Sequence, residues 1–178
     1  MKHFLIVVDM QTDFVNGALG TSEAQAILPG VCEKIKDFDG NVIVTLDTHE
    51  ENYMETREGK YLPVPHCIKG TDGHKLCPEV KAALDGRKKQ YRTVEKPTFG
   101  AADLPIFLWE DANGEPFTVE FIGVCTDICV ISNAMLVKAA FPEADIFCDA
   151  ALCAGVTPEA HRAALTVMKS CQIDVKNF

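Results

Sequence analysis

Residues 117–140 read FTVEFIGVCTDICVISNAMLVKAA, and this stretch decides the fold. Phe117 to Ile122 is an apolar run of strand length, which leads through Gly123 into a helical pattern from Asp127 to Ala140. The same alternation recurs along the chain. Further strands are predicted at Phe4 to Val8, Asn41 to Leu46, Ala144 to Phe147 and, more weakly, Gln90 to Val94, and further helices at Glu23 to Phe38, Pro78 to Leu84 and Pro158 to Met168.

Alternating strands and helices predict a parallel sheet covered by helices on both faces. We therefore expect an α/β fold, a three-layer αβα sandwich around a mainly parallel, doubly wound, Rossmann-like sheet. A length of 178 residues with 47% apolar composition fits one domain over residues 1–178. Ligands bind such sheets at the carboxyl ends of the strands, so side chains that directly follow strands are the first candidates for function.

Charge and composition restrict the partners and the compartment. A net charge of −9 argues against nucleic acid or an acidic membrane as a partner, because both are bound mainly by clustered Lys and Arg. The apolar run Phe4 to Val8 ends at Asp9, too short for a signal peptide or a membrane span. A chain of this size with eight cysteines and no export signal is expected to be cytoplasmic, with its thiols reduced.

Cys129 falls in the first turn of the helix predicted after the Phe117 strand. A thiol there faces unpaired backbone N–H groups and the positive end of the helix dipole, which favour the thiolate. The same N–H groups could hold an oxyanion. The alternative is that Cys125 and Cys129 pack as small apolar residues, the common fate of cytosolic cysteines. A zinc site of paired cysteines is disfavoured, because no second pair at that spacing accompanies them.

Two charged residues also follow predicted strands. Asp9 comes directly after the first strand, and Lys96 follows the Gln90 strand. Taken singly, Asp9 and Asp13 fit turn-forming residues and Lys96 fits a solvated surface residue. Taken together with Cys129, they form a workable acyl-transfer site, with Asp as base, Cys as nucleophile and Lys as a cation that holds both in their charged forms.

A metal site is a further possibility after the second strand. In the extended segment Asp47-Thr48-His49, the first and third side chains point the same way. His66 could supply a third ligand, and Glu55 or Glu58 a fourth. Oxygen and imidazole ligands fit zinc, iron or manganese better than calcium. An isolated Asp-x-His is more often a turn hydrogen bond, so spacing alone leaves both interpretations open.

Three segments of the chain resemble the signatures of the isochorismatase-like cysteine hydrolases. They are Asp9-Met10-Gln11-Thr12-Asp13-Phe14, Lys96 before Phe99-Gly100, and Gly123-Val124-Cys125-Thr126-Asp127-Ile128-Cys129-Val130, in an order and spacing that fit nearly the whole chain. Within that family, Asp47-Thr48-His49 and Pro65-His66-Cys67-Ile68-Lys69-Gly70-Thr71 resemble the metal-binding segments of nicotinamidases, which convert nicotinamide to nicotinate and ammonia, a step of NAD salvage and pyridine nucleotide biosynthesis.

The resemblance implies a cysteine amidohydrolase mechanism. Cys129 would attack the carbonyl, Asp9 would take its proton and later protonate the leaving ammonia, Lys96 would stabilise the charges, and water would hydrolyse the thioester. It also implies a cis peptide between Val124 and Cys125, with the N–H groups of Cys125 and Cys129 as the oxyanion hole.

The resemblance further implies a divalent metal, zinc before iron or manganese, that orients the ring nitrogen of the substrate. Its ligands would be Asp47, His49 and His66, with Glu58 favoured over Glu55 as the fourth.

The substrate is less determined, because nicotinamidases commonly place an aromatic residue where this chain has Pro63. A shift of one residue would let Tyr61 or Leu62 replace it, with Phe14 on the other side of the substrate. The alternatives are a metal-independent hydrolase of another small amide, and a non-catalytic small-ligand module in which Cys129 only packs. The family resemblance also suggests a homo-oligomer, and Trp109 is expected near the site or at a subunit contact.

Overall fold

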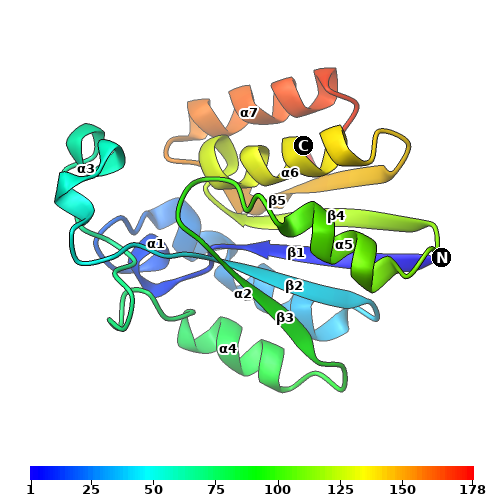
Figure 1. Cartoon of the computed structure of the whole chain (residues 1–178), viewed down its shortest axis with the longest axis horizontal. Helices are drawn as coiled ribbons and strands as arrows, with labels where there is room; N and C mark the ends of the chain where they lie inside the picture. Colours follow the sequence, from blue (N-terminus) through cyan, green and yellow to red (C-terminus); the bar gives the residue numbers. More distant parts are fainter.

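The computed structural model describes residues 1–178 and contains one sheet of six parallel strands (Figure 1). Their order across the sheet is β3-β2-β1-β4-β5-β6, which is the doubly wound arrangement with a switch point between β1 and β4. The strands are β1 (Lys2–Val8), β2 (Asn41–Asp47), β3 (Tyr91–Lys96), β4 (Phe117–Val124), β5 (Asp145–Ala154) and β6 (Asp174–Lys176).

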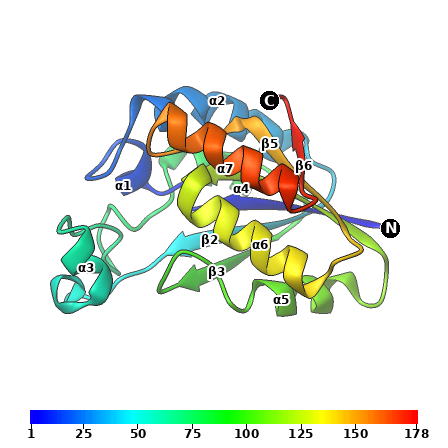
Figure 2. The same ribbon diagram turned by 90° about the horizontal axis from the view of Figure 1, so that it is seen from above.

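Helices cover both faces of the sheet and form the outer layers (Figure 2). The longer ones are α2 (Ser22–Asp37), α4 (Pro78–Asp85), α5 (Leu104–Ala112), α6 (Ile131–Ala140) and α7 (Pro158–Ser170). The shorter elements are α1 (Thr12–Val15), a 3-10 turn at Tyr53–Glu55, α3 (Arg57–Tyr61) and a π-helical turn at Thr126–Val130. None of these helices combines the length and the apolar character that crossing a membrane requires.

The core is split by the sheet into two apolar layers. Alternate residues of β1 point to opposite faces, so that Phe4, Ile6 and Val8 pack with α5, α6 and α7, whereas Leu5 and Val7 pack with α2 and α4. Because both faces of the strand are covered, β1 is a continuous apolar run rather than an alternating one. The predicted three-layer α/β fold is confirmed.

All five predicted strands and the four predicted helices are present, with boundaries shifted by a few residues. Elements that the sequence did not predict are α1, α5, the edge strand β6 and the short helices between Asp47 and Gly73. The predicted helix from Asp127 to Ala140 is divided, because a π-helical turn precedes α6. Turns of this kind are frequent at functional sites.

Gly123 lets β4 pass close to β1 beside the switch point. Its φ is 116°, and a Cβ atom there would lie 2.2 Å from the carbonyl oxygen of Val8. Only glycine fits this close approach, since any side chain would meet the backbone of the neighbouring strand. The loop that follows β4 therefore starts directly beside the one that follows β1.

Candidate active site

The three predicted catalytic side chains meet at the carboxyl edge of the sheet. Asp9 follows β1, Lys96 ends β3, and Cys129 lies in the turn after β4. The Nζ atom of Lys96 is 2.7 Å from Oδ2 of Asp9 and 3.6 Å from Sγ of Cys129. All three side chains are buried, Lys96 with only 1% of its surface exposed. A buried lysine requires compensating partners, and its other N–H groups donate to Asp47 and to the Thr98 carbonyl, each at 3.0 Å.

Asp9 is held in a defined orientation. Its backbone is left-handed, with a φ of 48°, which is uncommon for a residue other than glycine. Its Oδ1 atom accepts a hydrogen bond of 2.7 Å from the hydroxyl of Thr45, a residue of β2. Both oxygens of Asp9 are therefore engaged, Oδ1 by Thr45 and Oδ2 by the ammonium of Lys96.

Burial determines the protonation states at this edge. Burial raises the pKa of Asp9, although Lys96 opposes the shift, and a carboxylate with a raised pKa is a stronger base. Burial alone would lower the pKa of Lys96. The net effect is a raised pKa, because the attraction of Asp9, Cys129 and Asp47 is stronger than the effect of burial. The Lys96 side chain therefore remains an ammonium. Burial and the negative charge of Asp9 raise the pKa of Cys129 well above its ordinary value.

The helix start favours the Cys129 thiolate, as expected, but other groups around the sulfur outweigh this effect. The π-helical turn does place Cys129 before α6, but desolvation and Asp9 outweigh the attraction of Lys96. A thiol whose pKa is raised needs a base to become a nucleophile.

The peptide bond between Val124 and Cys125 is cis, as the family resemblance implies. The carbonyl of Cys125 accepts hydrogen bonds from Ile128 and Val130, which closes the turn that carries Cys129. The N–H of Cys125 itself has no acceptor within the protein. An unpaired N–H beside a nucleophile is what an oxyanion hole requires.

A second cluster adjoins the first through Asp47. Asp47, His49, Glu58 and His66 bring one ligand atom each to within 4.8 Å of one another. Nε2 of His49 is 2.9 Å from Oδ2 of Asp47, and Nε2 of His66 is 3.5 Å from the same oxygen. Glu58 completes the group, with Oε1 at 3.6 Å from His49 and 3.8 Å from His66. Glu55, the alternative, is exposed and outside the group.

The residues of this cluster fit a divalent metal. Nε2 of His49 is buried and, although it lies 2.9 Å from Oδ2 of Asp47, it forms no well-aligned hydrogen bond, which leaves it available to an ion. Nδ1 of His66 lies 2.8 Å from the Val64 carbonyl, which can only accept, and the proton on Nδ1 leaves Nε2 as the ligand atom. Ligands about 2.0 to 2.1 Å from a tetrahedral zinc ion lie roughly 3.3 to 3.5 Å apart, close to the spacings here.

Supporting contacts around this cluster were not predicted. Gln11 donates to the backbone carbonyl of Asp47 at 2.9 Å and accepts from its N–H at 2.8 Å, which fixes the end of β2. Asp13 accepts from the N–H of Cys67 at 2.8 Å, directly after His66. No strand alternation in the first signature could have indicated these contacts, because β1 ends at Val8, Asp9 is left-handed and Asp13 lies in α1. The buried ring of Tyr53 packs on both histidines, with centroids 4.7 and 5.0 Å away.

A cavity of about 280 Å³ lies over Cys129. Phe14 and Leu62, both predicted to contact the substrate, are part of its wall, and Asp47, Glu58 and His66 line it from the metal cluster. Tyr61 does not line this cavity, because its ring points outward from α3 and is 78% exposed. Cavity residues that the sequence did not predict are Leu19, Thr21, Phe99, Ile128 and Val156.

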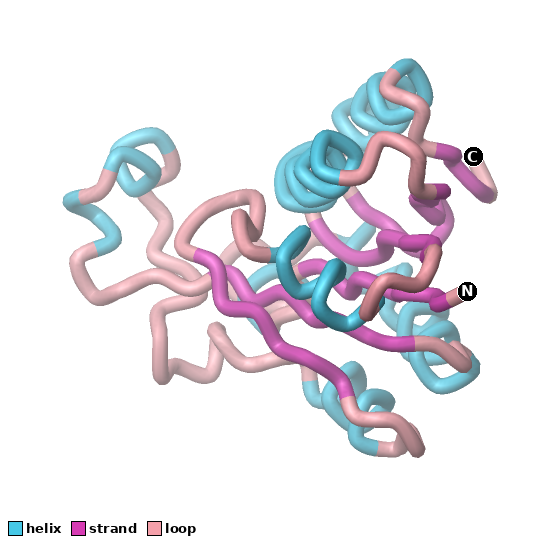
Figure 3. Tube along the Cα trace, turned by 45° about the vertical axis from the view of Figure 1, so that its right-hand side comes forward, coloured by secondary structure: helices cyan, strands magenta, loops and turns pink.

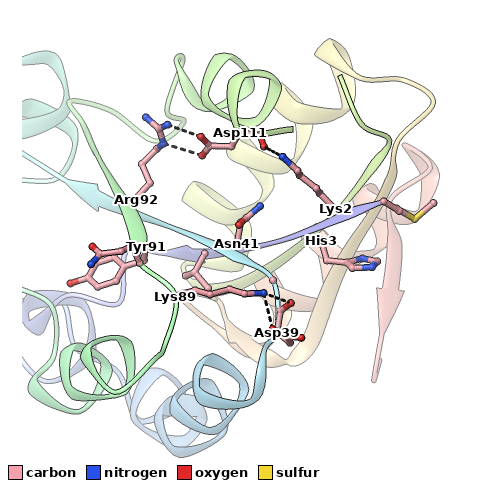
Figure 4. Close-up of a pocket in the computed structure, with 12 residues that line it drawn as sticks. Lys2, His3, Asp39, Asn41, Lys89, Tyr91, Arg92 and Asp111 are labelled. Carbon is pink, nitrogen blue, oxygen red and sulfur yellow. Dashed lines mark hydrogen bonds and ion pairs between the residues drawn. The ribbon is translucent and has the colours of Figure 1, made fainter. Parts of the chain in front are cut away.

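A larger hollow of about 670 Å³ lies at the opposite, amino edge of the sheet (Figure 4). Its charged side chains already pair with one another. Lys89 binds Asp39 at 2.7 Å, and Arg92 binds Asp111 through two hydrogen bonds of 2.7 and 3.1 Å. Its wall contains neither a cysteine nor a group of side chains able to hold a metal. The candidate nucleophile and the candidate metal ligands therefore both lie at the carboxyl edge.

Solved structures of similar fold include nicotinamidases and pyrazinamidases. The chain resembles the solved nicotinamidase/pyrazinamidase PncA from Bacillus subtilis with a TM-score of 0.85 and 28% identity, over 99% of this chain and 100% of that one. It resembles the pyrazinamidase of Pyrococcus horikoshii in complex with zinc with a TM-score of 0.82 and 27% identity, over the full length of both.

Sequence comparison covers about three quarters of the chain or more, depending on the match. The isochorismatase family protein PncA of Bacillus subtilis (strain 168) is 32% identical over 146 residues, 76% of this chain and 78% of that protein. Residues 3–176 match the family model described as the isochorismatase domain. The chain therefore belongs to the isochorismatase family.

Proposed function

We propose that this chain hydrolyses a small carboxamide, nicotinamide first, to a carboxylate and ammonia through a thioester on Cys129. The observation that carries the proposal is the position of Lys96, whose Nζ atom lies beside Asp9, Cys129 and Asp47 together. One buried ammonium thus joins a nucleophile and its base to a ligand set for a metal. The nicotinamidase and pyrazinamidase activities named for the solved relatives support the choice of substrate.

The first half of the reaction forms the thioester. Asp9 takes the proton of the Cys129 thiol as the sulfur attacks the carbonyl carbon and the C=O electron pair moves to oxygen. The N–H groups of Cys125 and Cys129 receive the oxyanion. When the C=O bond re-forms, the C–N bond breaks, and Asp9 returns its proton to the leaving nitrogen, which departs as ammonia.

The second half releases the acid. Water attacks the thioester carbon while Asp9 takes one of its protons. As the C–S bond breaks, Asp9 returns this proton to the sulfur and restores the thiol, and the acid loses its other proton to solvent and leaves as the carboxylate. Throughout the cycle Lys96 stays charged, because three anionic or polarisable partners raise its pKa. It therefore limits the build-up of negative charge as Asp9 and Cys129 exchange the proton.

The proposal includes a divalent ion held by Asp47, His49, Glu58 and His66. When bound, it supplies a Lewis acid that can bind a ring nitrogen of the substrate. The donor set favours zinc, with iron and manganese as alternatives. The zinc complex of the Pyrococcus horikoshii relative supports this order. Phe14, whose ring meets the edge of His66 at 5.4 Å between centroids, would then lie against the substrate ring.

Ammonia release from a panel of primary amides tests the proposal. With zinc-loaded protein we expect turnover of nicotinamide and pyrazinamide. Benzamide keeps the ring shape but has no ring nitrogen, and its kcat/KM should be at least about tenfold lower. Release of no ammonia from any amide would contradict the proposed hydrolase.

The metal is tested separately. His49→Ala should lose bound zinc, measured by elemental analysis, and nicotinamide turnover with it, whereas the exposed His3→Ala should keep both. Undiminished turnover in a zinc-free His49→Ala protein would favour a metal-independent amidase.

A further inference from the structure

The cavity over Cys129 adjoins a second, largely apolar hollow of about 490 Å³. The two spaces share four lining residues, which are Glu58, Leu62, Phe99 and Ile128. The outer hollow adds Thr98 and, from α3, Arg57 and Tyr61. This helix stands apart from the layers, beyond the carboxyl ends of the strands (Figure 3). The outer hollow is therefore an extension of the site rather than a separate surface.

Large apolar side chains at this mouth are left open to solvent. Tyr61 is 78% exposed, Phe99 43% and Leu62 37%. Exposed apolar side chains that gather around a cavity commonly mark a ligand-binding surface. A pyridine ring positioned over Cys129 would occupy the inner cavity and leave this outer surface uncovered.

Arg57 gives the outer hollow a charge. Its side chain is exposed, and its guanidinium lies 5.2 Å from the centroid of the Tyr61 ring without an ion-pair partner in the chain. Glu58, the neighbouring residue, also lines the outer hollow, but its Oε1 atom lies 3.6 Å from His49 and 3.8 Å from His66 and forms no ion pair with Arg57. An unpaired guanidinium stacked on an aromatic ring suits an aromatic group that ends in an anion.

We propose that the outer hollow is a subsite for the distal arm of an extended carboxamide, in which a flat apolar arm carries an anionic end. The amide would reach Cys129 through the inner cavity, the arm would lie on Tyr61, Leu62 and Phe99, and the anion would meet Arg57. This inference rests on the proposed function, because it assigns the substrate class of the same site. It also gives Tyr61 a substrate contact outside the inner cavity.

Three substrates separate the two subsites in an ammonia-release assay with zinc-loaded protein. The first is nicotinamide itself. The second carries a phenyl group on a ring carbon remote from the amide, and the third carries a carboxyphenyl group at the same position. The two extended compounds are tested in all their positional isomers. For at least one isomer we expect a KM below that of nicotinamide, lowest for the carboxyphenyl compound. Arg57→Gln should raise the KM for the carboxyphenyl compound about tenfold and leave nicotinamide and the phenyl compound unchanged.

Two further variants sharpen the test. Lys60→Gln removes a neighbouring exposed cation that does not line the hollow, and it should change none of the three KM values. Tyr61→Ala should raise the KM for both extended compounds. Two results would contradict the subsite and leave the proposed function intact. One is that nicotinamide is hydrolysed and none of the extended isomers is. The other is that Arg57→Gln, like Lys60→Gln, leaves all three KM values unchanged. If no amide is hydrolysed, the subsite and the proposed function both fail.

A second copy of this chain is the other possible occupant of the outer hollow. In that case Arg57→Gln and Tyr61→Ala would change the molar mass measured by light scattering and leave the KM values of the extended amides unaltered. That result would overturn the subsite.

Discussion

At the scale of single residues, the buried Lys96 connects the side chains of the candidate site. It is fully enclosed, and its ammonium lies between two carboxylates, those of Asp9 and Asp47, at 2.7 and 3.0 Å. A buried charge is tolerated only with such partners, and each carboxylate in turn depends on the lysine. Lys96 thus stabilises both buried carboxylates and connects the proposed nucleophile with the proposed metal ligands.

Removal of this cation should destabilise the fold. Lys96→Met leaves two buried carboxylates without their partner, and we expect the free energy of unfolding to fall by roughly 3 to 5 kcal/mol, measured by urea denaturation. Lys69→Met, which breaks the exposed pair with Glu95, should behave as wild type. Equal stability of the two variants would show that Asp9 and Asp47 do not need the lysine.

Asp9 should affect the thiol and the reaction in opposite directions. Its negative charge contributes to the raised pKa of Cys129, so Asp9→Asn should lower that pKa. Alkylation of Cys129 by iodoacetamide, which requires the thiolate, should then become faster near neutral pH and reach its plateau at a lower pH than in wild type. Turnover of nicotinamide should nevertheless fall by about 100-fold or more, because the base is gone.

The readout is the alkylation rate of the Cys129 peptide, followed by mass spectrometry from about pH 6 to 10. The exposed Asp85→Asn serves as the control. Slower alkylation in Asp9→Asn, or unchanged turnover, would argue against Asp9 as the neighbouring base. The raised pKa also means that slow alkylation of wild-type Cys129 does not by itself indicate a packing role.

At the scale of elements, the site depends on how closely β4 passes β1. Gly123→Ala places a Cβ against the Val8 carbonyl and imposes an unfavourable φ, so we expect a loss of more than about 2 kcal/mol in urea denaturation. Gly86→Ala is the matched control, since its φ is −73° and the nearest atom to an added Cβ is 3.3 Å away. Similar stability of both variants would contradict the close approach.

The turn after β1 should control metal affinity although it supplies no ligand. Gln11 binds both the N–H and the carbonyl of Asp47, and loss of such support typically weakens metal binding by about 10- to 100-fold. Gln11→Ala should show this loss in a zinc competition titration with a chromophoric chelator. The exposed Gln25→Ala should not. A Gln11→Ala protein with wild-type affinity would mean that β2 alone fixes Asp47.

At the scale of the whole molecule, the strand order brings the site together. The carboxyl ends of β1, β2, β3 and β4 are neighbours, and the register of β2 with β3 sets Asp47 directly beside Lys96. The sequence could predict this convergence, because buried parallel strands are continuous apolar runs and the polar residue that ends each run is easy to locate. Asp9 and Asp47 are such residues, whereas Lys96 ends the edge strand β3, which is mostly polar and was predicted only weakly.

Other features of the fold and the site could not be predicted from the sequence, because they depend on tertiary packing rather than on a local sequence pattern. Helix α5 is apolar nearly all around and contains a proline in its first turn, so it shows no helical period. The edge strand β6 has only three residues. The outward direction of Tyr61 follows from how α3 stands off the sheet, and the raised pKa of Cys129 follows from its burial.

The contacts of Trp109 also depend on the fold. It is 66% exposed on α5 and does not line the cavity over Cys129. A subunit contact there, like the expected homo-oligomer, remains a prediction.

The central claim is that Cys129 is the nucleophile of an amide hydrolysis at this convergence of strands. The most direct measurement is ammonia release from nicotinamide by Cys129→Ala, with the partly exposed Cys171→Ala as the control and circular dichroism to confirm that both are folded. We predict that Cys129→Ala loses at least about 1,000-fold in kcat while Cys171→Ala matches wild type. A folded Cys129→Ala protein that retains turnover within about tenfold of wild type would contradict the account.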